Sequence, residues 1–445
     1  MLKRKKILFI SYYFPPAGGG GVQRALKFVK HLPSFGWEPV VLSASNSMVS
    51  QNDESLLQNL PPEVSVYRVR RFSLLPFVDK FRTNKKREYD KNGRPVLAKS
   101  KNRFFMPFTC IVNWFYDFSR YLANNILYIP DEHAGWLPGS VVKGIWLVKK
   151  HDLKMIFATG NPWTSFLTAL ILSKLTGVPF IIDFRDPWTL DPYFKSPGAV
   201  HKWLSGKFEK LCVHYAEKVL FTCDSCMKAY QKEYPNEQNK KFITITHGFE
   251  LEDFRGIVPT EPEKFTISYI GTLYPRFKWG LDAFFEAVSN LLLKNPEIGN
   301  NLRINFAGIA HNCLEYYFEK HKIGEVVKII SYLDHRESLK RMMEASLLLI
   351  FDGNRAVQIP GKIFEYFASG KPILALVSDE SDVASLMRNA NAGMVVDPRN
   401  VKNVEAAILY FYQGKWKEKT SRSIAGFERR KLARCLAGIF DSVIS

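Results

Sequence analysis

The chain has 445 residues, which is enough for two or three domains with separate cores. Its hydrophobic content of 46% and charged content of 24% are typical of a soluble globular protein, and no apolar stretch reaches the ~18 residues that a membrane-spanning helix needs. A net charge of +19 favours anionic partners, namely nucleic acid, a membrane surface or phosphorylated substrates.

Six cysteines spread over so long a chain predict free thiols in a reducing compartment. Cys223 and Cys226 form an isolated CxxC, without the second pair of ligands that a zinc site needs, and packing is the expected role. The N-terminal segment has the composition of a signal peptide, but its short apolar part runs into Pro15 and Pro16 and indicates a buried strand instead.

The first half of the chain alternates short apolar runs with helical patterns such as Val22–Leu32 and Ser165–Leu175. This alternation predicts a parallel sheet that is covered on both faces. The expected strands are Ile7–Tyr12, Pro39–Ser43, Val64–Arg70, Met155–Ala158, Phe180–Phe184, Val219–Thr222 and Ile243–Thr246.

A run of glycines, which includes Gly19, Gly20 and Gly21, follows the first strand. It fits a dinucleotide fingerprint badly, because Gln23 stands where the third glycine is needed and no acidic residue closes the second strand. We expect bare backbone that a phosphate or sugar could approach, or else a flexible surface loop.

A long insertion separates the third expected strand from the fourth. Lys80–Arg103 carries ten basic residues against two acidic ones, and Phe104–Tyr128 is rich in aromatic residues spaced as one helical face. Such an order is typical of a membrane-docking segment for an anionic surface. The alternative is an aromatic face packed on the first domain and a solvated basic loop.

Polar residues Asp183, Arg185 and Asp186 stand at the end of an apolar strand, where side chains face the cleft of a parallel α/β fold. Arg185 and Asp186 could instead simply pair with each other. His247 and Gly248, after the last strand of this half, are expected to be architectural.

Residues Leu251–Lys264 hold two prolines, a glycine and several charges, and are expected to form a hinge. A second alternating series follows, so the predicted architecture is α/β, with two Rossmann-like domains that face each other across a cleft. Its expected strands are Thr266–Ile270, Arg303–Ala307, Val327–Tyr332, Leu347–Phe351, Ile373–Val377 and Met394–Val396. The predicted domains are residues 1–252 and 265–426, with the hinge at 253–264 and a final helix at 427–445.

The loop that begins at Gly271 and Thr272 carries two cations, Arg276 and Lys278, directly after the first strand of the second domain. Cations in that position could neutralise a leaving diphosphate. Either could instead be a solvated surface charge. Asp334 and Glu337 match a capping box, so neither is assigned a catalytic role.

Segment Gln358–Leu376 reads as a loop, a short helix and a strand, placed after the apolar strand Leu347–Phe351. Pro360 and Gly361 would open the helix and Gly370 would close it in the left-handed conformation. The N-terminus of that helix attracts a diphosphate, and Lys362 adds a charge there. Glu365, one turn later, could bind a ribose diol, or it could merely face solvent.

The string PGKIFEYFASGKPILA in this segment resembles the donor site of retaining glycosyltransferases of family four, which have the GT-B fold. That family carries two glutamates seven residues apart, the second of which binds the nucleotide ribose. Glu365 matches the second, whereas Val357 stands in place of the first and Thr272 in place of a common arginine.

The resemblance extends to other segments. It implies that the glycine-rich loop lines the cleft, that the loop Tyr332–His335, with Leu333, lies beside the nucleotide base, and that the last helix crosses back to the first domain. The string DFRDPW at 183–188, and Asp131, His133 and Trp136, also resemble a subset of the family. Through them, His133 becomes a candidate for the acceptor side of the cleft.

No DxD follows a strand and no His/carboxylate cluster has metal-ligand spacing, so we expect no metal and no cofactor besides a nucleoside-diphosphate sugar. The resulting hypothesis is a metal-independent, retaining glycosyltransferase at the cytoplasmic face of a membrane. It would move a sugar from a UDP- or GDP-sugar to a lipid-linked or polysaccharide acceptor. The alternative is a non-catalytic binding protein with a degenerate donor site, whose insertion engages a membrane or nucleic acid. Nucleic acid is not expected, because the charge is concentrated in one insertion and lines no sheet with stacking aromatics.

Overall fold

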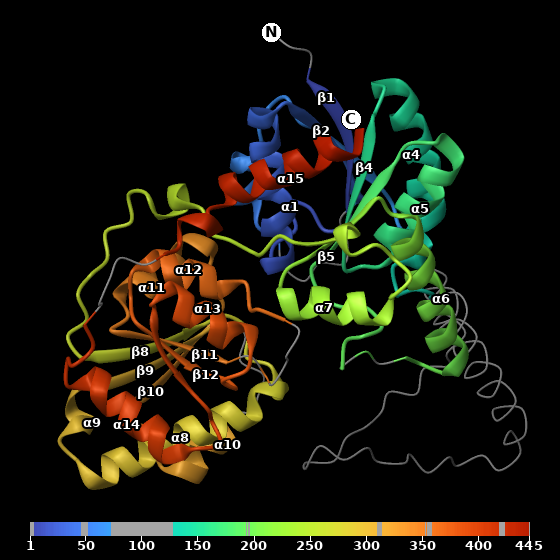
Figure 1. Ribbon diagram of the computed structural model, residues 1–445. Coiled ribbons are helices and arrows are strands. Elements are labelled where there is room, and N and C mark those ends of the chain that lie inside the picture. The colour runs from blue at the N-terminus through green and yellow to red at the C-terminus, as the bar shows by residue number, and fades with distance from the viewer. Residues whose placement is uncertain are drawn as a thin grey trace, which may run out of the picture.

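The computed structural model describes residues 4–45, 52–72, 128–192, 194, 196–308, 314–351, 353, 358–417 and 423–444 (Figure 1). The insertion at 80–128 lies outside these residues except for its last one, and Val357 lies outside them as well. Two domains are present, each built on a parallel sheet, so the predicted α/β class with two Rossmann-like halves is confirmed. Within the described ranges, no helix is both long enough and apolar enough to cross a membrane.

The first domain contains a seven-stranded parallel sheet in the order β3-β2-β1-β4-β5-β6-β7. The apolar runs form its strands because both faces of the sheet are covered; every residue of β4, for example, is buried. The strands are β1 Lys5–Ser11, β2 Trp37–Ala44, β3 Ser65–Val69, β4 Met155–Gly160, β5 Phe180–Phe184, β6 Lys218–Phe221 and β7 Phe242–Thr244.

Helices cover both faces of this sheet. The alternating residues of β1 show it, since Phe9 packs in one cluster with helices α1 and α15 and Leu8 packs in another with α4, α5 and α6. The helices of the first domain are α1 Gly20–His31, α4 Leu137–His151, α5 Thr164–Thr176, α6 Ala199–Tyr215 and α7 Asp224–Glu233.

The second domain contains a six-stranded parallel sheet in the order β10-β9-β8-β11-β12-β13. Its strands are β8 Phe265–Ile270, β9 Leu302–Ala307, β10 Val327–Ile330, β11 Leu347–Phe351, β12 Ile373–Leu376 and β13 Gly393–Val396. Its helices are α8 Lys278–Lys294, α9 Ile298–Asn301, α10 Leu314–His321, α11 His335–Glu344, α12 Lys362–Ser369, α13 Asp382–Ala390 and α14 Val401–Tyr412. Short 3-10 helices occur at Leu32–Phe35, Glu54–Asn59, Ala134–Trp136, Asn239–Lys241, Leu251–Phe254, Pro275–Phe277 and Ala425–Phe427.

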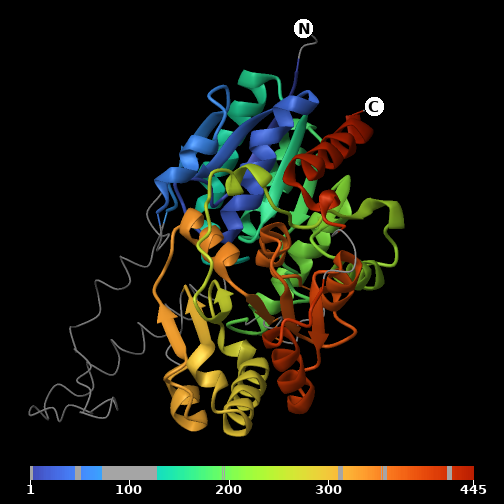
Figure 2. The same cartoon turned by 90° about the vertical axis from the view of Figure 1, so that its left-hand side faces the viewer.

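The last helix, α15 (Arg429–Ile444), lies against α1 of the first domain, although it follows the whole second domain in the chain (Figure 1). Phe440 anchors it, with its ring centroid 5.2 Å from that of Trp37. Asp441 accepts a hydrogen bond from the Trp37 ring nitrogen at 3.2 Å. Figure 2, turned by 90°, shows the same helix beside the first domain and the second domain below it.

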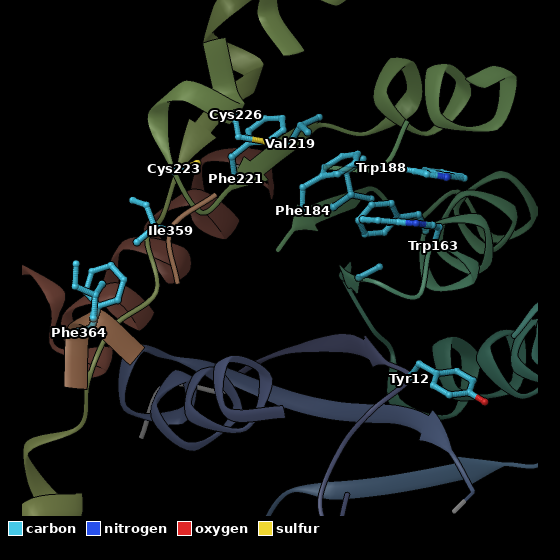
Figure 3. Close-up of a cluster of buried hydrophobic side chains, with 14 of the residues drawn as sticks. Tyr12, Trp163, Phe184, Trp188, Val219, Phe221, Cys223, Cys226, Ile359 and Phe364 are labelled. Carbon is cyan, nitrogen blue, oxygen red and sulfur yellow. The ribbon is translucent and has the colours of Figure 1, made fainter. Parts of the chain in front are cut away.

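One apolar cluster is shared by the two domains. Cys223 and Cys226, at the start of α7, lie in the same cluster as Ile359 and Phe364 of the second domain (Figure 3). Both thiols are buried and free, so the isolated CxxC serves packing, as expected for Cys223. The side chain of Asp382 also accepts a hydrogen bond from the backbone of the first domain, at residue 225.

Candidate functional site

The carboxyl ends of the two sheets face a shared cavity of about 700 Å³. This is the crevice where ligands of open parallel sheets bind, and its volume lies within the range of roughly 300–1,000 Å³ of small-molecule sites. The loops after β1, β4, β5 and β7 line it from the first domain, and the loops after β8, β9 and β10 together with the start of α12 line it from the second. The residues used below are Tyr13, Gly19, Gly21, Asn161, Arg185, Asp186, His247, Tyr269, Gly271, Thr272, Tyr274, Arg276, Leu333, His335, Gln358, Gly361, Lys362, Glu365 and Arg429.

Helix α12 is held directly against the end of β8. The Tyr366 hydroxyl accepts a hydrogen bond from the Ile270 N–H at 2.9 Å, and one face of the helix is buried. Gly361 is its N-cap residue, and Gly370 closes it with φ at 76°, as the sequence predicts. The N–H groups of Ile363 and Phe364 donate to the carbonyl oxygens of Pro360 and Gly361, at 3.1 and 3.3 Å. Gly361 and Lys362 line the cavity, so the positive end of the helix dipole lies beside it and favours an anion there.

Lys362 presents a buried amine to this cavity. In the part of the chain that the structure describes, its Nζ has no hydrogen-bond partner, and it lies 3.8 Å from the ring centroid of Tyr269. Burial lowers the pKa of Lys362 to about 7, and the Arg276 charge adds to this, whereas the Glu365 carboxylate opposes it. An amine in this state gains a partner when an anion enters the cavity.

Glu365 stands one turn further along α12 and faces a second cluster of charges. Burial lowers the pKa of the Arg429 guanidinium, and Glu365 is the main charge that opposes this effect. Burial also lowers the pKa of His335, but a 3.3 Å hydrogen bond with Asp253 and the Glu365 charge outweigh it, so the net direction is upward. The Glu365 carboxylate thus lies close enough to Arg429 and His335 for its charge to oppose the effect of burial on the pKa of both.

His247 also faces the cavity, next to the start of α12, where a Cβ on Gly361 would lie 3.8 Å from its ring. Burial, together with the charges of Arg24, Arg429 and Arg185, holds the pKa of His247 well below its usual value. The expectation that this segment is architectural holds for Gly248, where a Cβ would lie 2.1 Å from the Phe427 carbonyl oxygen, and for the buried Phe249, whose N–H donates to that oxygen at 3.1 Å.

The glycine-rich loop lines the cavity from the first domain through Gly19 and Gly21, while Gly20 begins α1. Gly19 has φ at 98°, a conformation that other residues rarely adopt. Arg185 supports this loop: its guanidinium donates hydrogen bonds to the carbonyl oxygens of Gly21, Asn161 and Gly160.

Asp186, the neighbour of Arg185, contributes differently. Its carboxylate accepts a hydrogen bond from the Gln358 side chain of the second domain, so it links the two walls of the cavity. Arg185 therefore binds backbone carbonyl groups of the first domain, whereas Asp186 forms a hydrogen bond across the two domains.

The expectation that Asp183 faces the cleft is wrong. Its carboxylate is completely buried and forms a two-point ion pair with Arg24 of α1, at 2.8 and 3.0 Å. Thr159 donates a further hydrogen bond to it at 2.8 Å. The reason is that the side chain at this position of β5 points under α1, where a carboxylate needs a buried cation.

His133 likewise does not reach the cavity. Its Nε2 lies 3.0 Å from the hydroxyl of Tyr13, which does line the cavity, and its Nδ1 lies 3.0 Å from the Arg71 guanidinium. Because a guanidinium only donates, Nδ1 accepts and Nε2 donates to Tyr13. Burial lowers the pKa of His133 to about 4, so the ring is neutral and supports Tyr13 from behind.

The cations of the loop after β8 lie in different surroundings. Lys278 is the first residue of α8, is exposed, and is not among the residues that line the cavity. Arg276 does line it, with its guanidinium carbon 3.9 Å from the Tyr274 ring centroid. Thr272, within this loop, and Leu333, after β10, also line the cavity. Asp334 caps α11 through a 2.7 Å hydrogen bond from the Glu337 N–H, as predicted.

Several residues at the cavity were not singled out from the sequence, namely Tyr13, Asn161, Tyr269, Gln358 and Arg429. Arg429 is the clearest case, because its position depends on the return of α15 to the first domain, where its N–H bonds the Phe249 carbonyl at 2.9 Å. His335 belongs to the loop that the resemblance placed beside the nucleotide base, and it lines the cavity. Among the described residues, no group of three or more His, Cys, Asp or Glu side chains is arranged to hold a metal ion.

Comparison with known proteins agrees with this arrangement. Residues 252–428 match the family model "Glycosyl transferases group 1". No curated protein matches the chain significantly. Sucrose-phosphate synthase from Thermosynechococcus elongatus is a similar solved structure, with a TM-score of 0.65, 13% identity and 99% of each chain covered.

Two further solved structures are similar to the chain. A glycosyltransferase from Rickettsia africae has a TM-score of 0.62 at 13% identity, with 99% of each chain covered. The lipopolysaccharide outer core galactosyltransferase WaaB has a TM-score of 0.55 at 14% identity, with 98% of this chain and 99% of that one covered. Likeness at such identity shows the fold alone. Residues 252–428 match a glycosyl transferases group 1 domain, and the chain as a whole has the two-domain GT-B fold of these solved structures.

Proposed function

We propose that the cavity binds a nucleoside-diphosphate sugar and that the enzyme transfers the sugar, with retention and without a metal ion, to a lipid-linked or polysaccharide acceptor. The observation that carries this proposal is the buried amine of Lys362, which lacks a hydrogen-bond partner in the described structure and borders a cavity with a helix N-terminus beside it. A diphosphate supplies the charge and the acceptor oxygens that this amine lacks.

The donor is oriented by groups along α12 and the loops beside it. The diphosphate lies at Gly271 and the start of α12, where Lys362 and Arg276 offset the charge that develops as it leaves. The Glu365 carboxylate accepts hydrogen bonds from the ribose diol, and the base, uracil or guanine, lies near Leu333. No cofactor beyond the donor takes part, and nucleic acid is not a partner.

The acceptor enters from the first domain, past the glycine-rich loop, Tyr13 and Asp186. The similarity to WaaB, a lipopolysaccharide outer core galactosyltransferase, supports an acceptor of the cell-envelope type. We propose accordingly that the protein works in the cytoplasm at the inner face of a membrane, with an anionic lipid surface as a partner.

The test is release of nucleoside diphosphate from a panel of UDP- and GDP-sugars, first with water and then with membrane extracts as acceptor. The expected result is release from one donor class, accelerated by the extract and reduced at least tenfold in Lys362→Met. The Lys278→Met variant, which changes an exposed lysine outside the cavity, is the matched control and should keep its activity. Binding of a nucleotide without release from any donor would favour the non-catalytic binding protein instead.

A further inference from the structure

Helices α4, α5 and α6 form one layer on the first sheet, and the outer side of this layer carries an unusual charge. The three helices neighbour one another in sequence order along one side of the molecule (Figure 1). All lie within the described residues, and they contain a single acidic side chain, Glu209, which is buried. Their lysines are Lys143, Lys149, Lys150, Lys174, Lys202, Lys207 and Lys210.

Large apolar side chains stand exposed among these lysines. On α6, Trp203 is 62% exposed and Val200 is 50% exposed, one turn apart on the same stripe. On α4, Val142 is 71% exposed and Trp146, four residues later, is 43% exposed. Leu175, at the end of α5, is 63% exposed. We call this surface the α4–α6 face.

The lysines and aromatic rings of the α4–α6 face are in direct contact. Lys143 and Lys150 place their Nζ atoms 3.8 and 4.4 Å from the ring centroid of Trp146. Lys174 places its Nζ 3.2 Å from the ring centroid of Tyr215. The ammonium groups therefore lie over aromatic rings, and cationic and aromatic groups share one surface, as they do at a water–lipid boundary.

We propose that the α4–α6 face docks on an anionic lipid bilayer. Lysines without intervening acidic groups attract the headgroups, and Trp203, Trp146 and Val142 enter the boundary between headgroups and acyl chains. Nucleic acid would satisfy the lysines but offers no apolar environment for exposed aliphatic side chains such as Leu175. The proposal deepens the membrane partner of the proposed function, and it rests on described helices independently of the insertion at 80–128.

The position of the face suits a lipid-linked acceptor. Asn161, which lines the cavity, directly precedes the start of α5, whereas Leu175 lies at the other end of that helix. The layer that carries the face therefore extends from the mouth of the cavity outward. A bilayer against it would hold an acceptor headgroup close to the first-domain wall.

The test is flotation of the full chain with vesicles of phosphatidylcholine and phosphatidylglycerol in equal parts, compared with vesicles of pure phosphatidylcholine. The wild-type chain should float with the anionic vesicles and be released as salt rises. A Trp203→Ser/Lys207→Glu/Lys210→Glu variant should partition at least about tenfold more weakly. The matched control is Trp279→Ser/Lys402→Glu/Lys415→Glu, which removes one exposed tryptophan and two exposed lysines from the second domain and should bind as the wild type does.

A second readout reports insertion rather than charge alone. Vesicles with brominated acyl chains should quench tryptophan fluorescence of the wild-type chain more than that of Trp146→Ser/Trp203→Ser, because bromine quenches only rings that reach the boundary. Equal flotation of the wild type and of the Trp203→Ser/Lys207→Glu/Lys210→Glu variant (the α6 variant) would overturn the proposal. If Lys85→Ala/Lys86→Ala/Arg87→Ala lost binding in the same assay, the insertion would be the docking segment instead. Absence of vesicle binding with retained binding of an oligonucleotide that the α6 variant loses would also overturn it.

These outcomes separate the docking surface from the donor site. Calorimetric binding of UDP and GDP by the α6 variant should equal that of the wild type, since none of its changes lies at the cavity. If the α6 variant no longer floats with vesicles but binds UDP or GDP normally, its changes affect the α4–α6 face and leave the donor site intact. A wild-type chain that floats but binds neither nucleotide would contradict the proposed function and leave the face supported.

Discussion

A Cβ atom on Gly271 would lie 2.4 Å from Nζ of Lys362, so the buried amine occupies the space that a side chain at position 271 would need. Gly271 also has φ at 131°, which strains any other residue. The glycine after β8 and the lysine at the start of α12 therefore form one structural unit. Thr272 follows this glycine in the sequence, and a cation reaches the glycine from the facing helix α12.

Replacing Lys362 by methionine should weaken binding of the donor nucleotide and at the same time stabilise the unliganded protein. A charge-assisted hydrogen bond contributes roughly 1.5–3 kcal/mol, so the dissociation constant should rise about tenfold or more. The free energy of unfolding should not fall, because the change removes a buried amine without a described partner. Calorimetry and denaturant titration measure the two effects, and a variant that is merely misfolded would lose both.

Donor binding should be coupled to proton uptake at Lys362. Its pKa of about 7 lies below the ordinary lysine value of 10.5, so between these values the unfolded chain binds more protons there than the folded chain. The contribution of Lys362 to the free energy of unfolding therefore rises with pH across this window, and Lys362→Met removes that slope. A diphosphate favours the protonated amine, so the complex should take up protons from the buffer above pH 7. In calorimetry, the observed enthalpy of binding should then differ between buffers that have different ionisation enthalpies. No uptake in the wild type would contradict this picture.

Glu365→Ala should weaken nucleotide binding about tenfold or more if the carboxylate accepts hydrogen bonds from the ribose diol, because each such bond is worth roughly 1.5–3 kcal/mol. The matched ligand is the 2′,3′-dideoxy form of the same nucleotide, which lacks the diol. Wild type and variant should bind this ligand equally. If the variant lost affinity for both ligands equally, Glu365 would act through its electrostatic effect on Arg429 and His335, and would not bind the diol.

Transfer activity should survive chelation. The cavity offers the cations Lys362 and Arg276 to the leaving diphosphate, and no three-ligand grouping of His, Cys, Asp or Glu occurs among the described residues. Activity measured with and without EDTA should therefore agree. Abolition by EDTA with recovery on addition of magnesium or manganese would contradict the metal-independent route.

Asp183→Asn should act on stability rather than directly on donor binding. Removing one partner of a buried ion pair costs about 3–5 kcal/mol, because the Arg24 charge is left buried without its counter-charge. The double variant Arg24→Met/Asp183→Leu should recover much of this loss. Denaturant titration measures the free energy of unfolding of both variants. If Asp183→Asn were as stable as the wild type but inactive, Asp183 would have a direct role in the reaction, contrary to this prediction.

Local features of this protein follow from nearby residues, and the sequence alone determined them. The apolar runs became the strands of two parallel sheets because strands buried on both faces need continuous hydrophobic stretches. Helix α12 begins after Pro360 and ends at Gly370 because the chemistry of its caps acts within a few residues. Glu365 and Lys362 could be singled out for the same reason, since Lys362 begins that helix and Glu365 follows about one turn later.

Only the tertiary structure decided which charged side chains reach the cavity. Lys278 and Arg276 are two residues apart, yet the start of α8 carries Lys278 to the surface while Arg276 remains at the cavity. Asp183 pairs with Arg24, 159 residues away in the chain. Arg429 reaches Glu365 because α15 returns to the first domain. Each of these outcomes depends on distances between segments that are remote in sequence. Burial then shifts the pKa values of the groups that meet, and neither effect can be inferred from a local sequence pattern.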